Sequence, residues 1–503
     1  MTTANTPANR TSESHRQSNR QQHLASLIAR YNQRTATCKR YAATYRPVLA
    51  DKSSLGLGFI PELKELCYPI VIEKSAGSRV WDIDGNEYID ILMGLGINLF
   101  GHNPDFVQQA ISAQLDKGMQ ITAQAELAGE VAQLICQLTG TERVTFSNTG
   151  TEAVMTAIRV ARAATQRSKI ALFTNSYHGH SDHTLVRATL SEYAKKAVSR
   201  VLERRIRSHN WLSFLLRPIQ SGLQARLNPK AVPAASGIPA QIAENVLVLD
   251  YGSPQSLQII QAHRRDLAAV LVEPVQSRCP ELQPRQFLHQ LREITSAAQI
   301  ALIFDEMVTG FRIHPGGAQA WFGIEADLVT YSKIIGGGLP LSVIAGKATY
   351  LDHIDGGLWH YGDTSAPATK TTFFAGTFCK HPLALAAAKA VLQHLQTKGP
   401  NLQQQLNQRT AHLVERLNQF CQSQQIPLQF THFGSFFAVD RSHSAVSADG
   451  PDLLAYHLLL RGIHLRPGDK GGFLSTAHTD SEIDRIAQAF QDSIHELYQG
   501  GYL

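Results

Sequence analysis

The stretch IALIFDEMVTGFR, residues 300–312, decides the fold class of this chain. An apolar run leads directly into Asp305, which is typical of a strand buried on both faces of a mainly parallel sheet. In open α/β sheets, ligands bind at the carboxyl ends of the strands. Asp305 therefore either caps a turn or contacts a ligand, and this stretch alone leaves both readings open.

A second stretch, YSKIIGGG at 331–338, places Lys333 just before three glycines, where the backbone can approach a ligand closely. Alone, such a lysine is more often a solvated loop residue. Together, a strand-terminal acid and a nearby lysine are what pyridoxal phosphate requires. The acid keeps the cofactor's ring nitrogen protonated, and the lysine holds its aldehyde as a Schiff base.

The surrounding sequence predicts an α/β fold in which strands and helices alternate. Residues 80–94, VWDIDGNEYIDILMG, read as a β-hairpin around Asp84-Gly85-Asn86. Further strands are expected at 143–147, 169–174, 245–250, 268–274 and 300–306, and helices at 105–117, 125–138, 151–165 and 283–297. This order indicates a mainly parallel sheet covered by helices on both faces.

The length of 503 residues predicts more than one lobe, since single cores stop growing near roughly 250–300 residues. We expect the following division: a basic polar tail with a short helical segment (1–50), the N-terminal part of a small domain (51–100), a large domain (101–380, with an insert at 190–239) and a C-terminal small domain (381–503).

Composition narrows the class of protein. Residues 1–50 hold eight Lys/Arg and one acid, so the remainder, with 39 basic and 40 acidic residues, is close to neutral. The first 20 or so residues are too polar to bury much surface, and we expect them to form a solvated tail. Residues 23–46 could form a helix. Docking of the tail to an acidic partner protein is the lesser alternative.

Six cysteines without a CxxC pair fit reduced thiols and imply no metal. We expect a cytoplasmic protein without a membrane segment.

The insert breaks the alternation. Residues 190–232 carry nine Lys/Arg against two acids, with Trp211 and Phe214 among them. Basic residues with aromatics can bind nucleic acid, but a single helical insert on an enzyme more often forms a lid or a surface for a partner protein. We expect protein contact and no nucleic acid.

Two further motifs follow predicted strands. In SNTGTEA (147–153), the N–H groups of Gly150 and Thr151 and the hydroxyls of Thr149 and Thr151 suit a phosphate at a helix N-terminus, although a plain threonine cap explains the motif equally. SYHGHSD (176–182) offers the ring of Tyr177 and the imidazole of His178. The histidines here lack metal-ligand spacing, which favours stacking and hydrogen bonding.

Six motifs in this order resemble class III pyridoxal phosphate aminotransferases of fold type I, and most closely the glutamate-1-semialdehyde aminomutase branch: SNTGTEA, YHGHSD, VEPVQ, LIFDEMVTGFR, YSKIIGGG and AGTFCKHPLA. The resemblance covers about residues 60–495. Within that branch, 314–338 and 371–384 look especially similar to aminotransferase domains of polyketide and nonribosomal peptide assembly lines. The implied fold is a large domain with a seven-stranded type of sheet plus a smaller α+β domain.

The resemblance also implies roles. Lys333 would form the Schiff base and carry the proton between substrate and cofactor, and Asp305 would pair with the ring nitrogen. Tyr177 would stack on one face of the ring. Met307, where the family usually has valine, would pack on the other.

By the same resemblance, Thr149, Gly150 and Thr151 would hold the phosphate. His178 and Glu273 would support the ring and the surroundings of its hydroxyl group. Gly376 and Thr377 match a GT pair that reaches the phosphate from the neighbouring subunit, which implies a homodimer with shared sites.

The implied reaction is transamination from an amino acid donor, by resemblance glutamate, to a keto acceptor. The assembly-line likeness makes that acceptor a β-ketoacyl thioester on an acyl carrier protein, which the basic insert and tail would meet. One alternative is glutamate-1-semialdehyde 2,1-aminomutase, which shares every cofactor residue. Another is a non-catalytic cofactor-binding or scaffold protein, which the presence of both Lys333 and Asp305 disfavours.

Overall fold

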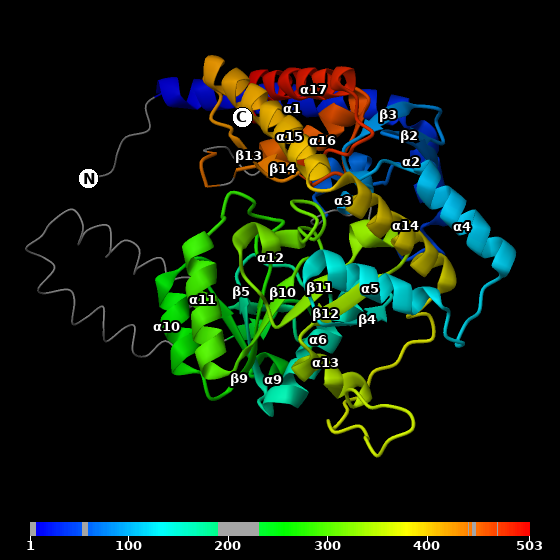
Figure 1. Cartoon of the computed structure of the whole chain (residues 1–503). Coiled ribbons are helices and arrows are strands. Elements are labelled where there is room, and N and C mark those ends of the chain that lie inside the picture. The colour runs from blue at the N-terminus through cyan, green and yellow to red at the C-terminus, as the bar shows by residue number, and fades with distance from the viewer. Residues whose placement is uncertain (1–6, 53–58, 190–230, 441, 445–448, 470) are drawn as a thin grey trace, which may run out of the picture.

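The computed structural model describes residues 7–52, 59–189, 231–440, 442–444, 449–469 and 471–503. The chain forms two lobes. In Figure 1 the large lobe lies below and the small lobe, built from both ends of the chain, lies above. The expected insert at 190–239 falls mostly outside the described residues. None of the described helices combines the length and the apolar character needed to cross a membrane.

The large lobe is built on a seven-stranded sheet of order β4-β12-β11-β10-β9-β5-β8. Its strands are β4 (Arg143–Ser147), β5 (Lys169–Phe173), β8 (Val246–Leu249), β9 (Leu267–Val272), β10 (Ala301–Asp305), β11 (Leu328–Tyr331) and β12 (Ser342–Gly346). Strand β12 runs antiparallel to both of its neighbours, while the pairs among β11, β10, β9, β5 and β8 are parallel. The predicted mainly parallel α/β sheet is confirmed.

Alternate residues of each strand enter different cores, which explains their continuous apolar runs. On one face, Ala301 and Ile303 pack with the apolar side of α6 (Gly150–Thr165) and with α13 (Ala348–Asp355). On the other, Leu302 and Phe304 join the main core. The remaining helices of this lobe are α5 (Leu127–Thr139), α9 (Ala240–Ala243), α10 (Pro254–Ala262), α11 (Arg285–Ala298) and α12 (Gly317–Phe322), with the 3₁₀ turn η4 (Lys333–Gly336).

The small lobe holds two short sheets, of order β1-β2-β3-β15 and β13-β14-β16. Their strands are β1 (Ile72–Ala76), β2 (Arg79–Asp82), β3 (Glu87–Asp90), β13 (Phe430–Phe433), β14 (Phe436–Val439), β15 (Ile463–His464) and β16 (Gly471–Phe473). The predicted hairpin is confirmed as β2 and β3. A further pair, β6 (Val186–Ala188) and β7 (Ala231–Pro233), flanks the insert.

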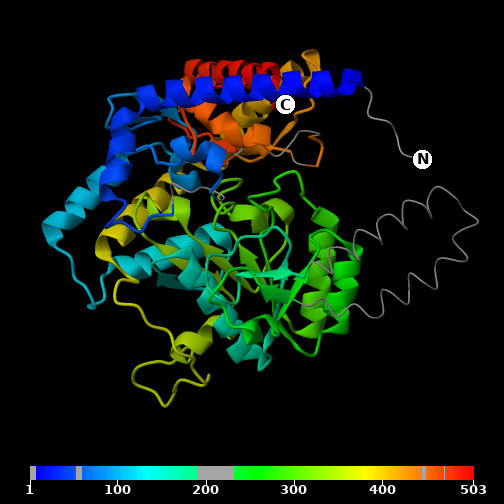
Figure 2. The ribbon, with the colours of Figure 1, turned by 180° about the vertical axis from the view of Figure 1, so that it is seen from behind.

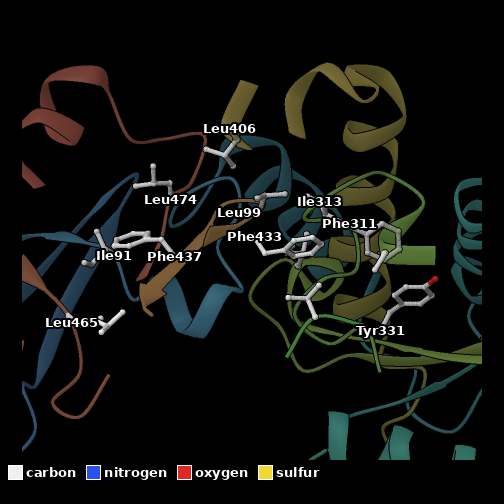
Figure 3. Close-up of a cluster of buried hydrophobic side chains, with 14 of the residues drawn as sticks. Ile91, Leu99, Phe311, Ile313, Tyr331, Leu406, Phe433, Phe437, Leu465 and Leu474 are labelled. Carbon is white, nitrogen blue, oxygen red and sulfur yellow. The ribbon is translucent and has the colours of Figure 1, made fainter. Parts of the chain in front are cut away.

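The helices of the small lobe and its border are α3 (Met93–Gly96), α4 (Asp105–Lys117), α14 (Pro382–Lys398), α15 (Asn401–Ser423), α16 (Asp449–Leu460) and α17 (Asp480–Gln499), with η2 (Pro61–Leu66). Helix α14 packs on α4, α5 and η4, and so joins the lobes. A cluster of buried side chains, including Phe311 and Ile313 from the large lobe and Phe433 and Phe437 from the small one, fills the space between them (Figure 3).

The helix expected within 23–46 is present, and the polar residues before it, expected as a solvated tail, are helical from Pro7 onward. Helix α1 (Pro7–Arg34) lies across the small lobe beside α17, and α2 (Ala36–Tyr45) follows it (Figure 2). Leu27 and Tyr31 are fully buried, and Arg20 donates a hydrogen bond to the carbonyl of Gly501. Local composition did not reveal the contacts of residues near position 20, because their partners lie at the other end of the chain.

Candidate active site

The candidate site lies at the carboxyl edge of the large sheet. Asp305 is the last residue of β10, and Tyr177 and His178 lie in the turn that follows β5. Glu273 comes directly after β9, and Lys333 closely follows β11. Because these four strands are parallel, side chains far apart in sequence meet at one edge.

The centre of the site is a buried hydrogen-bonded pair of side chains, His178 and Asp305. Nδ1 of His178 lies 2.7 Å from Oδ2 of Asp305, and the two side chains are 1% and 2% exposed. The other oxygen of Asp305 accepts a hydrogen bond from the backbone N–H of Met307, at 3.1 Å. Nε2 of His178 is buried and has no hydrogen-bond partner among the described residues. The pair thus presents a carboxylate in a fixed orientation.

Glu273 supports the segment that carries Tyr177. Its carboxylate accepts hydrogen bonds from the backbone N–H of Tyr177, at 2.9 Å, and from the N–H and hydroxyl of Ser277. Burial, followed by the nearby charge of Asp305, raises the pKa of Glu273. The ring of Tyr177 is half exposed, and the guanidinium of Arg278 lies over it at 5.5 Å from the ring centroid.

Lys333 occupies a strained backbone position. Its φ of 53° lies in the left-handed region, which non-glycine residues rarely adopt and which costs about 1–3 kcal/mol. The side chain is partly buried, and its amine forms no hydrogen bond or ion pair with a described residue. Burial lowers the pKa of Lys333, and the charge of Asp305 opposes this shift. The amine is therefore easier to deprotonate than an ordinary lysine.

The N-terminus of α6 forms the second part of the site. Thr149 caps the helix: its hydroxyl accepts from the N–H of Glu152 at 3.2 Å, and the Glu152 carboxylate accepts from the N–H groups of Asn148 and Thr149. The N–H groups of Gly150 and Thr151 belong to the first turn, where the helix itself provides no acceptors. The threonine-cap reading is thus correct, and it leaves an anion-binding end intact.

Two glycines of the site lie where a side chain would meet a neighbouring residue, which explains why glycine occurs at both positions. A Cβ at Gly150 would lie 3.0 Å from the sulfur of Met307, so the helix end and the residue two after Asp305 pack tightly. At Gly179, where φ is 81°, a Cβ would lie 2.4 Å from the hydroxyl oxygen of Thr151. Only glycine lets the turn after β5 approach the start of α6 in this way.

Gly376 and Thr377 lie in an exposed turn of this chain. The turn is anchored by Cys379, whose N–H donates to the carbonyl of Gly376 at 3.3 Å and whose sulfur accepts from the side chain of Asn148 at 4.0 Å. The GT pair thus lies on the surface near the start of the α6 cap.

Sequence reasoning missed two residues of this region. Gly179 was visible as the glycine between His178 and His180, a pattern that indicates an unusual turn. Arg312 gave no signal, because an arginine in a short motif is normally expected at the surface. In the structure it is 1% exposed.

The sequence of this chain matches a protein-family model and is similar to those of several named proteins. The profile of the family described as aminotransferase class-III matches residues 62–210 and 219–488. Glutamate-1-semialdehyde 2,1-aminomutase of Persephonella marina is 34% identical over 442 residues, which cover 85% of this chain and 92% of that protein. The aminomutase of Alkaliphilus oremlandii is 32% identical over 437 residues, with the same two shares of coverage.

Solved structures of aminotransferases have a fold similar to that of this chain. An omega-transaminase from Sphaerobacter thermophilus has a TM-score of 0.75 at 26% identity, covering 92% of this chain and 98% of that one. A beta-phenylalanine aminotransferase from Variovorax paradoxus has a TM-score of 0.74 at 26% identity, covering 94% and 97%.

Proposed function

Because the chain belongs to the class-III aminotransferase family, whose members are pyridoxal phosphate enzymes, we propose that it transfers an amino group from glutamate to a keto acceptor. The observation that carries this proposal is the arrangement of Lys333 at the same sheet edge as the His178–Asp305 pair. A lysine whose pKa is lowered, next to a buried carboxylate, suits a nucleophile beside a cationic ring.

The residues present fit the cofactor. Nε2 of His178, whose ring contacts Asp305, is buried without a hydrogen-bond partner among the described residues, and the start of α6 offers N–H groups to a phosphate. In the proposed arrangement Asp305 pairs with the ring nitrogen, and Gly150 and Thr151 hold the phosphate. Tyr177 and Met307 contact the two ring faces. The bound cofactor supplies an electron-withdrawing ring that stabilises negative charge at the substrate carbon.

The protein's own part is to hold and move a proton. With its lowered pKa, the amine of Lys333 can accept a proton from the substrate carbon and return it to the acceptor. Glu273 fixes the backbone of Tyr177, and so keeps that ring in place during the exchange.

For the acceptor, we propose a β-ketoacyl thioester on an acyl carrier protein, as in polyketide and nonribosomal peptide biosynthesis. A neighbour of known structure is named for β-phenylalanine, so this fold accommodates an amine on a β-carbon. The excess of basic residues at 1–50 and 190–232 suits an acidic carrier protein, because complementary charge raises encounter rates.

A second candidate is the glutamate-1-semialdehyde 2,1-aminomutase reaction, in which the amine returns to the same carbon skeleton. The names of the relatives favour it. A free five-carbon substrate makes no use of the basic regions.

One experiment tests the assignment of Lys333 as the lysine that binds the cofactor. The purified protein is reduced with borohydride, digested and mapped by mass spectrometry; the cofactor is expected on the Lys333 peptide. Lys347, which pairs with Asp327 at 2.8 Å, is the control lysine and should stay unlabelled. Label on another lysine would contradict the proposal.

A second experiment separates the acceptors. After glutamate has converted the cofactor to its amine form, the protein is mixed with a β-ketoacyl carrier thioester or with glutamate-1-semialdehyde, and return of the aldehyde form is followed by absorbance. Return with only the semialdehyde would favour the aminomutase. Charge reversal at Arg204, Arg205 and Arg207 should slow the reaction with the carrier several-fold at low salt and leave the glutamate step unchanged.

We also propose that the active form is a homodimer with shared sites. Gly376 and Thr377 are exposed in the single chain, and the segment 358–378 that includes them exposes large apolar side chains: Leu358, Tyr361, Phe373 and Phe378. Exposed apolar residues gathered in one segment are typical of an interface. A partner subunit would cover this segment and bring its own Thr377 to the phosphate.

A further inference from the structure

A small pocket, here called the arginine pocket, lies between α6 and the segment that joins β5 to β6. Its volume is about 90 Å³. The residues that line it are Met155, Ile158, Arg159, Arg162, Ser181 and His183. The four from α6 recur at the spacing of one helix face. The pocket thus combines an apolar side with two guanidinium groups, an imidazole and a hydroxyl.

The arginine pocket is built on the same two elements as the candidate active site, but at a different place. Helix α6 begins at Gly150, and Arg159 follows nine residues later, about 13 Å along the helix at 1.5 Å per residue. Nδ1 of His180 lies 3.1 Å from the hydroxyl of Thr151, and this contact joins the segment after β5 to the start of α6. The pocket is therefore a neighbour of the anion-binding helix end and not part of it.

Both guanidinium groups are held in place by a backbone carbonyl. Nη1 of Arg159 donates to the carbonyl of Phe373 at 3.0 Å, and Nε of Arg162 donates to the carbonyl of Ser168 at 2.8 Å. An arginine has five N–H donors, so each of these bonds uses only one of them. Neutral carbonyls fix the two side chains without neutralising their charge.

The positive charge of the arginine pocket has no partner in the described part of the chain. No carboxylate there forms an ion pair with Arg159, Arg162 or His183. The acid next to the pocket in sequence, Asp182, is exposed. Burial and then the charge of Arg162 lower the pKa of His183, and Asp182 opposes this shift. Partly buried positive groups around one space favour an anion between them.

The donors of the arginine pocket match a tetrahedral oxyanion. Guanidinium groups bind phosphate through paired N–H donors, and a hydroxyl and an imidazole each add a single donor. A pocket of 90 Å³ exceeds the roughly 10–15 Å³ that one water molecule needs, so there is room for an anion of several heavy atoms.

We propose that the arginine pocket binds a phosphate group outside the cofactor site. Such a group has two sources, inorganic phosphate and the phosphodiester of the pantetheine arm by which a carrier protein holds a thioester. The binding of phosphate does not depend on amine transfer. Only the second source rests on the proposed carrier-bound acceptor.

Ser181 offers a matched pair of variants. Ser181→Asp places a carboxylate in the pocket, and Ser181→Asn places a neutral group of nearly the same size there. Arg159→Gln removes one guanidinium. The probe is inorganic phosphate, titrated into the full-length protein loaded with cofactor, so that the start of α6 is already occupied. Ionic strength is held constant with chloride, and binding is followed by the line width of the phosphate resonance in phosphorus NMR.

We expect Ser181→Asn to bind phosphate as the wild type does, and Ser181→Asp and Arg159→Gln to bind it at least about tenfold more weakly, because like charges repel and a donor pair is lost. Equal binding by the two Ser181 variants, or no binding by the wild type, would overturn the proposal. If Arg159→Gln does not fold, the Ser181 pair decides the question alone.

The source of the phosphate group is decided by the KM for a carrier-bound β-ketoacyl thioester. If the pantetheine arm occupies the pocket, Ser181→Asp raises this KM several-fold relative to Ser181→Asn and leaves the glutamate half-reaction unchanged. If the occupant is a free ion, the two variants have the same KM. A protein that binds phosphate in the expected order but turns over no carrier substrate would contradict the proposed acceptor and uphold the pocket.

Discussion

Nδ1 of His178 lies 2.7 Å from Oδ2 of Asp305, and this pair joins the turn after β5 to the end of β10. Its two members occur 127 residues apart in the chain. The pair orients one oxygen of Asp305 while the backbone N–H of Met307 orients the other. A carboxylate held at both oxygens cannot rotate away from a ligand.

We predict that Asp305→Asn slows the glutamate half-reaction by about 100-fold or more, equivalent to roughly 2.7 kcal/mol of transition-state free energy, because a neutral amide cannot keep the ring nitrogen charged. Single-turnover absorbance measures this rate. Asp327→Asn is the matched control: Asp327 is a buried carboxylate that pairs with Arg292 and Lys347. It should lower stability and leave the rate unchanged.

We predict that Gly179→Ala destabilises the protein by about 2–4 kcal/mol, because the left-handed backbone strain adds to a contact of 2.4 Å with Thr151. Gly85→Ala provides the control, since Gly85 has a similar φ, 83°, and nothing within 4 Å of its Cβ position. It should cost only about 1–2 kcal/mol. Chemical denaturation measures both; equal losses would show that the approach to Thr151 is unimportant.

The shared site predicts complementation between two inactive variants. Lys333→Ala lacks the amine, and Thr377→Asp places a negative charge against the phosphate. When equal amounts are unfolded and refolded together, half of the dimers are mixed. If Thr377 acts across the interface, each mixed dimer has one intact site, and about a quarter of wild-type activity should return. If it acts within its own subunit, no activity returns.

The docking of α1 should depend on pH. His23 of α1 and His457 of α16 approach to 3.1 Å between their Nε2 atoms, and the surrounding charges are Arg30, Glu496 and Arg461. Burial lowers the pKa of both histidines below the ordinary value of 6.5, although Glu496 opposes this. The unfolded state therefore binds protons first, and stability is lost as pH falls below about 6.5.

The measurement is hydrogen exchange of α1 between pH 7.5 and pH 5.5. Other buried histidines, such as His478, carry shifts of the same sign, so the total stability of the protein is not diagnostic. The diagnostic comparison is between the wild-type protein and His457→Gln. This variant should remove most of the pH dependence of hydrogen exchange within α1. An unchanged pH dependence would contradict a role for the histidine pair.

The sequence predicted the parts of the fold that depend on local patterns. Strands such as β10 were predictable because continuous apolar runs are required where a strand is buried on both faces. Strand β12 was missed because its five residues follow a glycine-rich segment and its antiparallel direction breaks the alternation. Helix α1 was missed in part because its order depends on Gly501 and other residues at the far end of the chain.

The candidate site shows the same division. Asp305 and Lys333 were predictable because pyridoxal phosphate requires an acid and a lysine, and the two residues occur at the end of a strand and just before three glycines. The pairing of His178 with Asp305 depends on strand order, and the burial of Arg312 depends on how the two lobes meet. Neither relationship has a signature in local sequence.

The antiparallel strand β12 affects how the reactive lysine reaches its place. Lys333 lies in the connection between β11 and β12, which are direct neighbours paired at Thr330 with Ile344 and at Tyr331 with Val343. A slip of one residue in this pairing would exchange the side chains of β12 between the two cores that cover the sheet, where they would no longer fit. A register error that misplaces the reactive lysine would therefore also disturb the packing on both faces of the large sheet, so the placement of the lysine and the stability of this lobe depend on the same strand pairing.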